Sequence, residues 1–167
     1  MQSTFKITNL TRAIRAWLIF FMATLFLSGL TAIPLEWELN VLSRLIPVHT
    51  NLGTWIDRVL VGLHETGIKY PFLFYGYDWL AFAHFILALL FIGPYLHPVR
   101  NKWVIQFGMI ACLLIIPYAL IAGHYRGIPW GWRVIDCSFG VLGIFPLAFC
   151  LHKIRQLEIL LSKNNEL

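Results

Sequence analysis

Four apolar runs, each long enough to cross a lipid bilayer, constrain this chain more than any other feature of its sequence. They cover residues 13–33, 78–96, 103–122 and 132–151. A helix needs about 20 predominantly apolar residues to cross a hydrocarbon core about 30 Å thick, because each residue adds about 1.5 Å. We therefore predict an all-α integral membrane protein, in which four transmembrane helices form a bundle and residues 1–167 make a single membrane domain.

The composition agrees with a lipid bilayer as the surroundings of the chain. Hydrophobic residues make up 59% of the 167 residues and charged residues only 13%, which is too apolar for a soluble domain of this length. The formal net charge is +5, but the basic residues lie in short flanks around the apolar runs. No basic patch with interleaved aromatic residues is present in the sequence, so we expect no nucleic acid partner.

The basic residues are divided unevenly between the two sides of the membrane. Eight lie in short segments on one side: Lys6, Arg12, Arg15, Arg100, Lys102, Lys153, Arg155 and Lys163. The other side carries five basic residues in longer segments, together with six of the eight acidic residues. The positive-inside rule therefore predicts cytoplasmic N- and C-termini for a multi-pass protein of a bacterial-type inner membrane. The first run ends in a poor signal-peptidase site, so we expect it to remain as a helix.

The connection between the first two runs, residues 35–70, is predicted to form an amphipathic helical cap on the outer, periplasmic side. One apolar stripe recurs with helical spacing, at Leu52, Trp55, Ile56, Val59, Leu60 and Leu63. Thr50 or Asn51 would cap this helix. A shorter helix is expected over residues 35–46, ended by Pro47, and the aromatic residues 70–77 would lead back into the membrane at headgroup depth.

The turn between the third and fourth runs concentrates polar side chains. Gly127, Pro129 and Gly131 break the helix there and favour a compact connection. Arg133 and Asp136 lie three residues apart on one helix face, so we expect them to form an ion pair.

The carboxyl group of Asp136 is expected to face the interior of the bundle. Asp136 shares a face with Gly140 and Gly143, whose small size lets another helix approach closely. A charged group facing lipid is costly, and a carboxylate within a membrane segment is normally paired or functional.

Histidines on the same side of the membrane suggest a transition-metal site. His84 is the only histidine placed well within the hydrocarbon, and His84, His124 and Asp136, with His64 from the cap, could ligate a metal ion. No spacing motif supports such a site, because His64-Glu65 lacks the second histidine of H-E-x-x-H. The other interpretation is that His84 forms a hydrogen bond between helices. Haem is less favoured, because His84 and His124 lie at different depths.

The candidate ligand-binding residues are His84, His124, Arg126, Arg133 and Asp136. Together they would line a polar pocket in the outer half of the bundle for an anionic lipid headgroup, a quinone or another small molecule. If Arg133 and Asp136 only neutralise each other, the protein is instead an accessory or assembly subunit that binds another membrane protein. A membrane enzyme or metal-binding protein using His84, His124 and Asp136 is the third hypothesis. Because the sequence has no catalytic signature, we favour binding or assembly and leave the enzyme question open.

Overall fold

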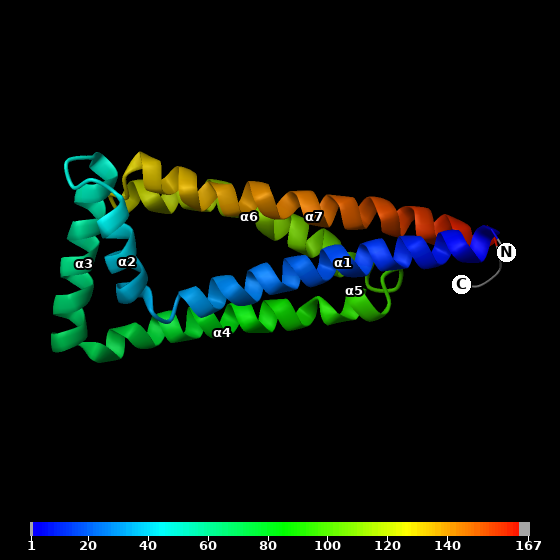
Figure 1. Cartoon of the computed structure of the whole chain (residues 1–167), viewed down its shortest axis with the longest axis horizontal. Helices are drawn as coiled ribbons and strands as arrows, with labels where there is room; N and C mark the ends of the chain where they lie inside the picture. The colour runs from blue at the N-terminus through cyan, green and yellow to red at the C-terminus, as the bar shows by residue number, and fades with distance from the viewer. Residues whose placement is uncertain (1, 164–167) are drawn as a thin grey trace.

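A computed structural model of the chain describes the backbone of residues 2–163 and the side chains of residues 5–163. Every regular element within these bounds is a helix, so the predicted all-α fold is confirmed (Figure 1). Four stretches are long and apolar enough to span a membrane, as predicted. The elements are α1 (Gln2–Thr31), α2 (Leu35–Leu45), α3 (Asn51–Lys69), the 3₁₀ helix η1 (Pro71–Phe74), α4 (Tyr75–Leu90), α5 (Ile92–Leu96), α6 (Lys102–Tyr125) and α7 (Trp130–Lys163).

Two of the long helices extend well beyond the predicted apolar runs. α1 begins before residue 13 and α7 continues past residue 151. These extensions carry charged residues, but they keep an apolar stripe at helical spacing, and Leu10, Ile154 and Leu157 are buried in the same core. Mean hydropathy falls where the charges begin, whereas the helix continues as long as one face can be buried.

The second predicted crossing is interrupted near one end. α4 ends at Leu90 and α5 begins at Ile92, because Pro94 has no backbone N–H to donate to the carbonyl one turn before it. The side-chain amide of Asn101 donates hydrogen bonds to the carbonyl oxygens of Gly93 (3.0 Å) and His97 (3.1 Å). Both carbonyl oxygens also accept a backbone N–H, from His97 (2.9 Å) and Asn101 (3.0 Å) respectively, so the Asn101 side chain adds a second bond to each and fixes the chain after α5.

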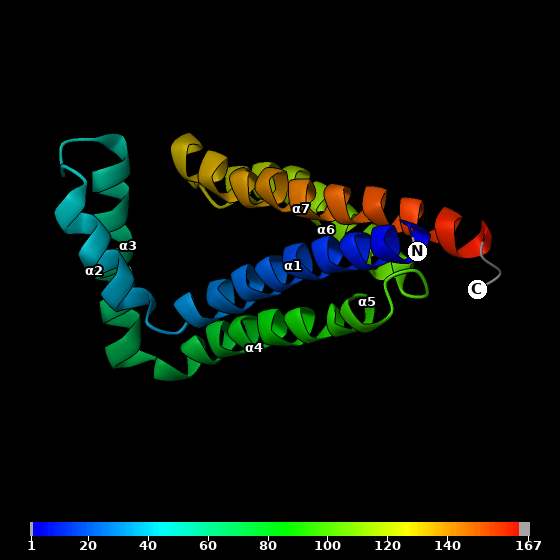
Figure 2. The same ribbon diagram turned by 45° about the vertical axis from the view of Figure 1, so that its right-hand side comes forward.

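The four membrane helices form two pairs, α1 with α4 and α6 with α7, and α1 also packs against α7. The pairs meet at the end of the molecule where α1 begins and α7 ends, which we call the terminal end (Figure 1). They separate towards the opposite end, where α2 and α3 lie across the gap; we call this the hairpin end. The view turned by 45° shows the same separation (Figure 2).

The hydrophobic core is confined to the terminal half of the bundle. The buried core residue nearest to the hairpin end is Phe21 in α1, Cys112 in α6 and Leu147 in α7. Phe91, between α4 and α5, links this part of the chain to α1 and α6, because its ring stacks edge-on against Phe21 and lies against Gly108 of α6. Within the described residues, no four-helix core continues towards the hairpin end.

The α2–α3 hairpin has a small core of its own, as the apolar stripe predicts. Leu39, Ile56 and Leu63 are buried in it. Thr50 is the N-cap of α3, because its side-chain oxygen accepts a 3.0 Å hydrogen bond from the Gly53 amide. Trp132 of α7 packs against this cluster, which gives the hairpin an apolar contact with the other helix pair.

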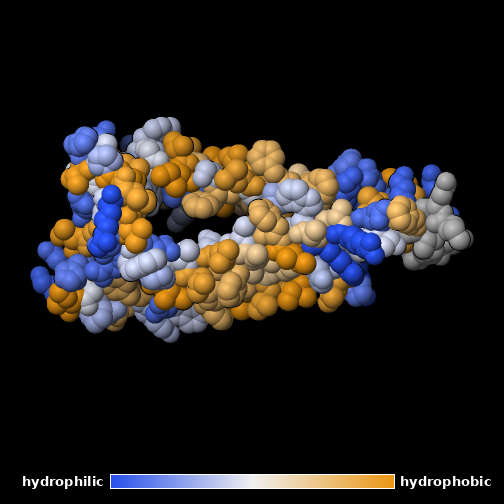
Figure 3. All heavy atoms as spheres, viewed as in Figure 1, coloured by the Kyte–Doolittle hydropathy of each residue, from blue (hydrophilic) through white to orange (hydrophobic). Residues whose placement is uncertain are grey.

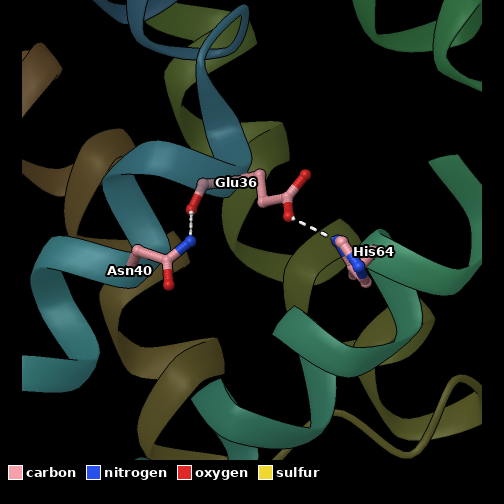
Figure 4. Close-up of polar contacts among 3 residues, drawn as sticks. All are labelled: Glu36, Asn40 and His64. Atoms are coloured by element: carbon pink, nitrogen blue, oxygen red, sulfur yellow. Dashed lines mark hydrogen bonds and ion pairs between the residues drawn. The ribbon is translucent and has the colours of Figure 1, made fainter.

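A polar contact also joins α2 to α3. Nδ1 of His64 lies 3.1 Å from Oε1 of Glu36, and the side-chain amide of Asn40 donates to the Glu36 carbonyl oxygen at 2.8 Å (Figure 4). His64 and Glu36 are largely exposed, so we expect their pairing to contribute less than about 1 kcal/mol to stability.

Candidate functional site

The space between the two helix pairs is the candidate site. The space-filling view shows an opening between α6–α7 and α1–α4, bounded at one end by α2 and α3 (Figure 3). It lies where the helices diverge beyond the end of the core cluster. We call this space the inter-pair hollow.

Helical periodicity places Asp136 of α7 on the wall of this hollow. Leu147 and Ile154 have no exposed surface and belong to the core between the helix pairs. Asp136 precedes them by about three and about five helical turns, respectively, so the three side chains share one face. The face that is buried at the terminal end therefore continues into the hollow at Asp136.

Asp136 lines a groove of about 330 Å³ between α6 and α7. The wall is formed mostly by small and apolar residues of the α6 face, and Arg126 also lines it. The Asp136 side chain is half-buried, and no residue between 5 and 163 forms a hydrogen bond or an ion pair with its carboxyl group. A carboxyl group in an apolar span therefore faces the groove without a partner from the described part of the chain. The full lining is Ile115, Tyr118, Ala119, Ala122, Gly123, Arg126, Ile128 and Asp136.

The expected ion pair between Arg133 and Asp136 does not form within the described residues. Arg133 turns instead towards the α6–α7 connection, where its Nε donates a 2.7 Å hydrogen bond to the Ile128 carbonyl oxygen. Its aliphatic part lies so close to Gly123 that an added Cβ there would be 2.9 Å from it. Among the described residues, the Ile128 carbonyl group has no hydrogen-bond partner within a helix. The bond from the nearby Arg133 guanidinium group therefore satisfies both the carbonyl group and the arginine. Arg133 thus braces the turn behind the groove.

The opposite wall of the hollow carries hydroxyl groups that the sequence analysis missed. In α1, Trp17 packs on Phe149 and Phe21 lies near Gly143, so these two residues define the face towards α7. The same face continues at helical spacing through three small polar residues into the hairpin half. These residues are Thr24, Ser28 and Thr31.

Two of these hydroxyl groups are held by their own helix. Thr24 donates to the Phe21 carbonyl oxygen at 2.8 Å, and Thr31 donates to the Ser28 carbonyl oxygen at 3.0 Å. A hydroxyl group that donates in this way keeps its lone pairs as acceptors. The i, i+4, i+7 spacing of Thr24, Ser28 and Thr31 was the sequence signal for this polar face. Ser and Thr are common in membrane helices, however, and their spacing does not say which face meets another helix.

The predicted histidines lie in three separate places. His84 donates from Nδ1 to the carbonyl oxygen of Leu80 in its own helix, at 2.8 Å, and its Cβ lies where α4 packs against Gly29 of α1. His124 is exposed in the last turn of α6, and its ring lies edge-on to Tyr125. His64 is in the hairpin beside Glu36.

The structure therefore does not gather the predicted metal ligands. In the part of the chain that it describes, no three His, Cys, Asp or Glu side chains are arranged to hold a metal ion. His84, His124, Asp136 and His64 remain on separate elements. Of the predicted ligand-binding residues, Asp136 and Arg126 line the α6–α7 groove, and Arg133 lies in the turn behind it.

The fold and its four apolar helices define a multi-pass membrane protein. Searches with this chain found no matching protein-family model, no matching curated protein and no matching solved structure.

Proposed function

We propose that this protein binds a small amphiphilic ligand in the inter-pair hollow and that Asp136 anchors the polar end of that ligand. The observation that carries the proposal is the half-buried Asp136 carboxyl group, which has no hydrogen-bond or ion-pair partner among the described residues. A charged side chain costs about 2.5–3.5 kcal/mol at the centre of a membrane helix, and Asp136, in the second turn of α7, would carry part of that cost. Charged residues within membrane helices usually mark a site. A ligand that supplies the missing partner would offset this cost.

The walls of the hollow favour a ligand with a hydrogen-bond donor or a positive charge. The Asp136 carboxylate is an acceptor, and the Thr24 and Thr31 hydroxyl groups on the facing α1 wall have lone pairs free. Apart from Tyr118 and Arg126, the groove around Asp136 is lined by apolar and small residues, which suits a hydrocarbon tail along Ile115 and Ala119. We therefore propose an amphiphile whose polar end is an amine.

Arg126 does not oppose this assignment. It is exposed just after the last residue of α6, and its long side chain can extend towards the headgroups while its aliphatic part stays beside the groove. An anionic group on the outer part of the ligand would bind there.

The binding experiment compares two amphiphiles with the same tail and opposite charge. The purified protein, in detergent, is titrated with dodecylamine or with dodecanoic acid, and bound adducts are counted by native mass spectrometry. We expect one retained dodecylamine, lost in Asp136→Asn, and weaker retention of the acid. Asp78→Asn is the matched control, because Asp78 is an exposed acid at the start of α4 outside the groove. Equal retention by the wild type and Asp136→Asn would refute the anchor role.

The competing hypothesis is that Asp136 pairs with a basic residue of another membrane protein. The position of Asp136 favours a small ligand. We infer that its helix face turns into the inter-pair hollow, so a helix of another protein would have to enter the hollow to reach it. If purification of the wild-type protein yields a stoichiometric membrane partner that Asp136→Asn loses, and no amine adduct forms, the assembly hypothesis replaces the ligand hypothesis.

We also propose that the terminal end faces the cytoplasm of a bacterial-type inner membrane. The short basic segments from the N-terminus, the α5–α6 connection and the end of α7 lie together at the terminal end. The hairpin end carries most of the acidic residues. The positive-inside rule orients such a protein with its basic end inwards.

A further inference from the structure

A second groove, at the terminal end, lies between the start of α1 and the end of α7. Its volume is about 540 Å³, and it is lined by Phe5, Lys6, Asn9, Leu10, Ala13 and Lys153. The α1 residues in it recur at helical spacing on one side of the helix. This groove is at the opposite end of the molecule from Asp136 and has no part in the function proposed above.

Aromatic side chains position one of the two lysines. The Lys153 ammonium nitrogen lies 5.4 Å from the centre of the Phe149 ring. Phe149 in turn packs on Trp17 of α1, with ring centres 5.3 Å apart. A cation–π contact of this kind holds an ammonium group beside an apolar floor. Lys153 is therefore half-buried at the groove instead of extending freely into solvent.

The charge of the groove is not neutralised by the described residues. Lys6 and Asn9 form no hydrogen bond or ion pair with any residue from 5 to 163. The one acidic side chain that the structure describes at this end is Glu158, and both of its oxygens accept from Lys102 Nζ, at 2.9 and 2.6 Å. Two ammonium groups and a side-chain amide therefore line a groove without a counter-ion from this part of the chain.

The depth of the groove matches the headgroup layer. Lys6 and Ala13 are seven residues apart, or about 10 Å along the helix, and Trp17 lies one turn further towards the apolar part of α1. Tryptophan is enriched at the boundary between hydrocarbon and headgroups, and the headgroup layer is several ångströms thick. Basic pockets between membrane helices at such a depth bind anionic lipid phosphates.

We propose that this groove binds one anionic phospholipid of the leaflet at the terminal end. Its phosphate lies between Lys6 and Lys153 and accepts a hydrogen bond from the Asn9 amide, and an acyl chain follows the apolar surface past Ala13 towards Trp17. Free inorganic phosphate offers a phosphate group but no chain for the apolar part of the groove, so a phospholipid binds more tightly.

The test measures lipid binding by the whole purified protein after delipidation. Native mass spectrometry follows titration with phosphatidylglycerol, with phosphatidylcholine and with inorganic phosphate. We expect one phosphatidylglycerol bound about tenfold or more tightly than phosphatidylcholine, with inorganic phosphate competing only weakly. The double variant Lys6→Gln/Lys153→Gln should lose this preference, whereas Lys6→Arg/Lys153→Arg should keep it.

The control has the same change in charge on the same two helices. Arg12 and Arg155 are exposed and do not line the groove, so Arg12→Gln/Arg155→Gln should keep the preference for phosphatidylglycerol within about twofold. If both Gln double variants lose the preference for phosphatidylglycerol to the same extent, the lipid is attracted by overall charge, and the proposed site is refuted. If the wild type shows no preference for phosphatidylglycerol over phosphatidylcholine, or if inorganic phosphate displaces the lipid at equal concentration, the proposal also fails. The comparison of phosphatidylglycerol, phosphatidylcholine and inorganic phosphate on the wild-type protein tests the proposal even if a double variant does not fold.

Discussion

Asp136 and Ile154 lie on the same face of α7, yet Ile154 has no exposed surface and Asp136 lines an open groove. About five helical turns separate them. Ile154 is buried because α1 packs against the terminal half of α7, whereas α1 has moved away from α7 at the level of Asp136. One helix face is therefore part of the core at one end of the molecule and the wall of an open groove at the other.

Replacing the Asp136 carboxyl group should raise stability while abolishing amine binding. We expect Asp136→Leu to increase the free energy of unfolding by about 1–3 kcal/mol, because it removes a charge that no described residue pairs with. Thermal or denaturant unfolding of the purified protein measures this change. A loss of more than about 1 kcal/mol would show that the carboxyl group is paired within the protein.

Arg133 and Asp136 should behave as independent residues. The Arg133 guanidinium bonds to the Ile128 carbonyl oxygen and not to Asp136. Arg133→Ala and Asp136→Asn each change the free energy of unfolding. We therefore expect these two changes to add in the double variant, with a coupling energy below about 0.5 kcal/mol. Unfolding measurements on the four proteins give this coupling directly. A coupling above about 1 kcal/mol would restore the ion pair that the sequence spacing predicts.

Gly140 should tolerate no larger side chain, because it lies directly against the backbone of α6. A Cβ at residue 140 would lie 2.5 Å from the backbone carbonyl oxygen of Cys112, which cannot move without bending α6. We expect Gly140→Ala to lower the free energy of unfolding by more than about 2 kcal/mol. Gly131→Ala in the same helix is the control, because its Cβ meets nothing within 4 Å and alanine favours the helix. Similar unfolding midpoints for the two variants would contradict the close contact.

Trp132 should hold the α2–α3 hairpin against the α6–α7 pair. It is half-buried against the hairpin cluster, whereas Trp130, two residues before it, is exposed. We expect Trp132→Ala to speed hydrogen exchange in α2 and α3 and to leave exchange in the terminal core unchanged. Trp130→Ala should change neither region. Equal protection of the hairpin in the wild type and Trp132→Ala would mean that the hairpin is held by α1 and α4 alone.

Both ends of the chain should report a cytoplasmic location. A reporter that is active only in the cytoplasm should be active when fused after the C-terminus, because the basic segments gather at the terminal end. The same reporter inserted at Val48, in the α2–α3 connection, should be inactive. Activity at Val48 together with silence at the C-terminus would reverse the orientation of the hollow and of the lipid groove.

Features that depend on local chemistry could be predicted from the sequence. The four crossings follow from hydropathy, because a backbone in hydrocarbon must form its own hydrogen bonds. The apolar stripe of α3 follows from helical spacing, and its Thr50 cap follows from the need to satisfy free amides. The inward direction of Asp136 follows from the glycines on its face, and Gly140 does lie against α6.

The sequence by itself therefore determined which segments cross the membrane and which residues share a face of one helix. Only the tertiary structure decided where the helix pairs separate, and that separation places Thr24 and Thr31 on a wall of the hollow and keeps His84 away from His124. Spacing along one helix says which side chains share a face but not which partner is nearest. Arg133 could reach both Asp136 and the Ile128 carbonyl group, and the geometry of the turn, which depends on how α6 meets α7, made the carbonyl group its partner.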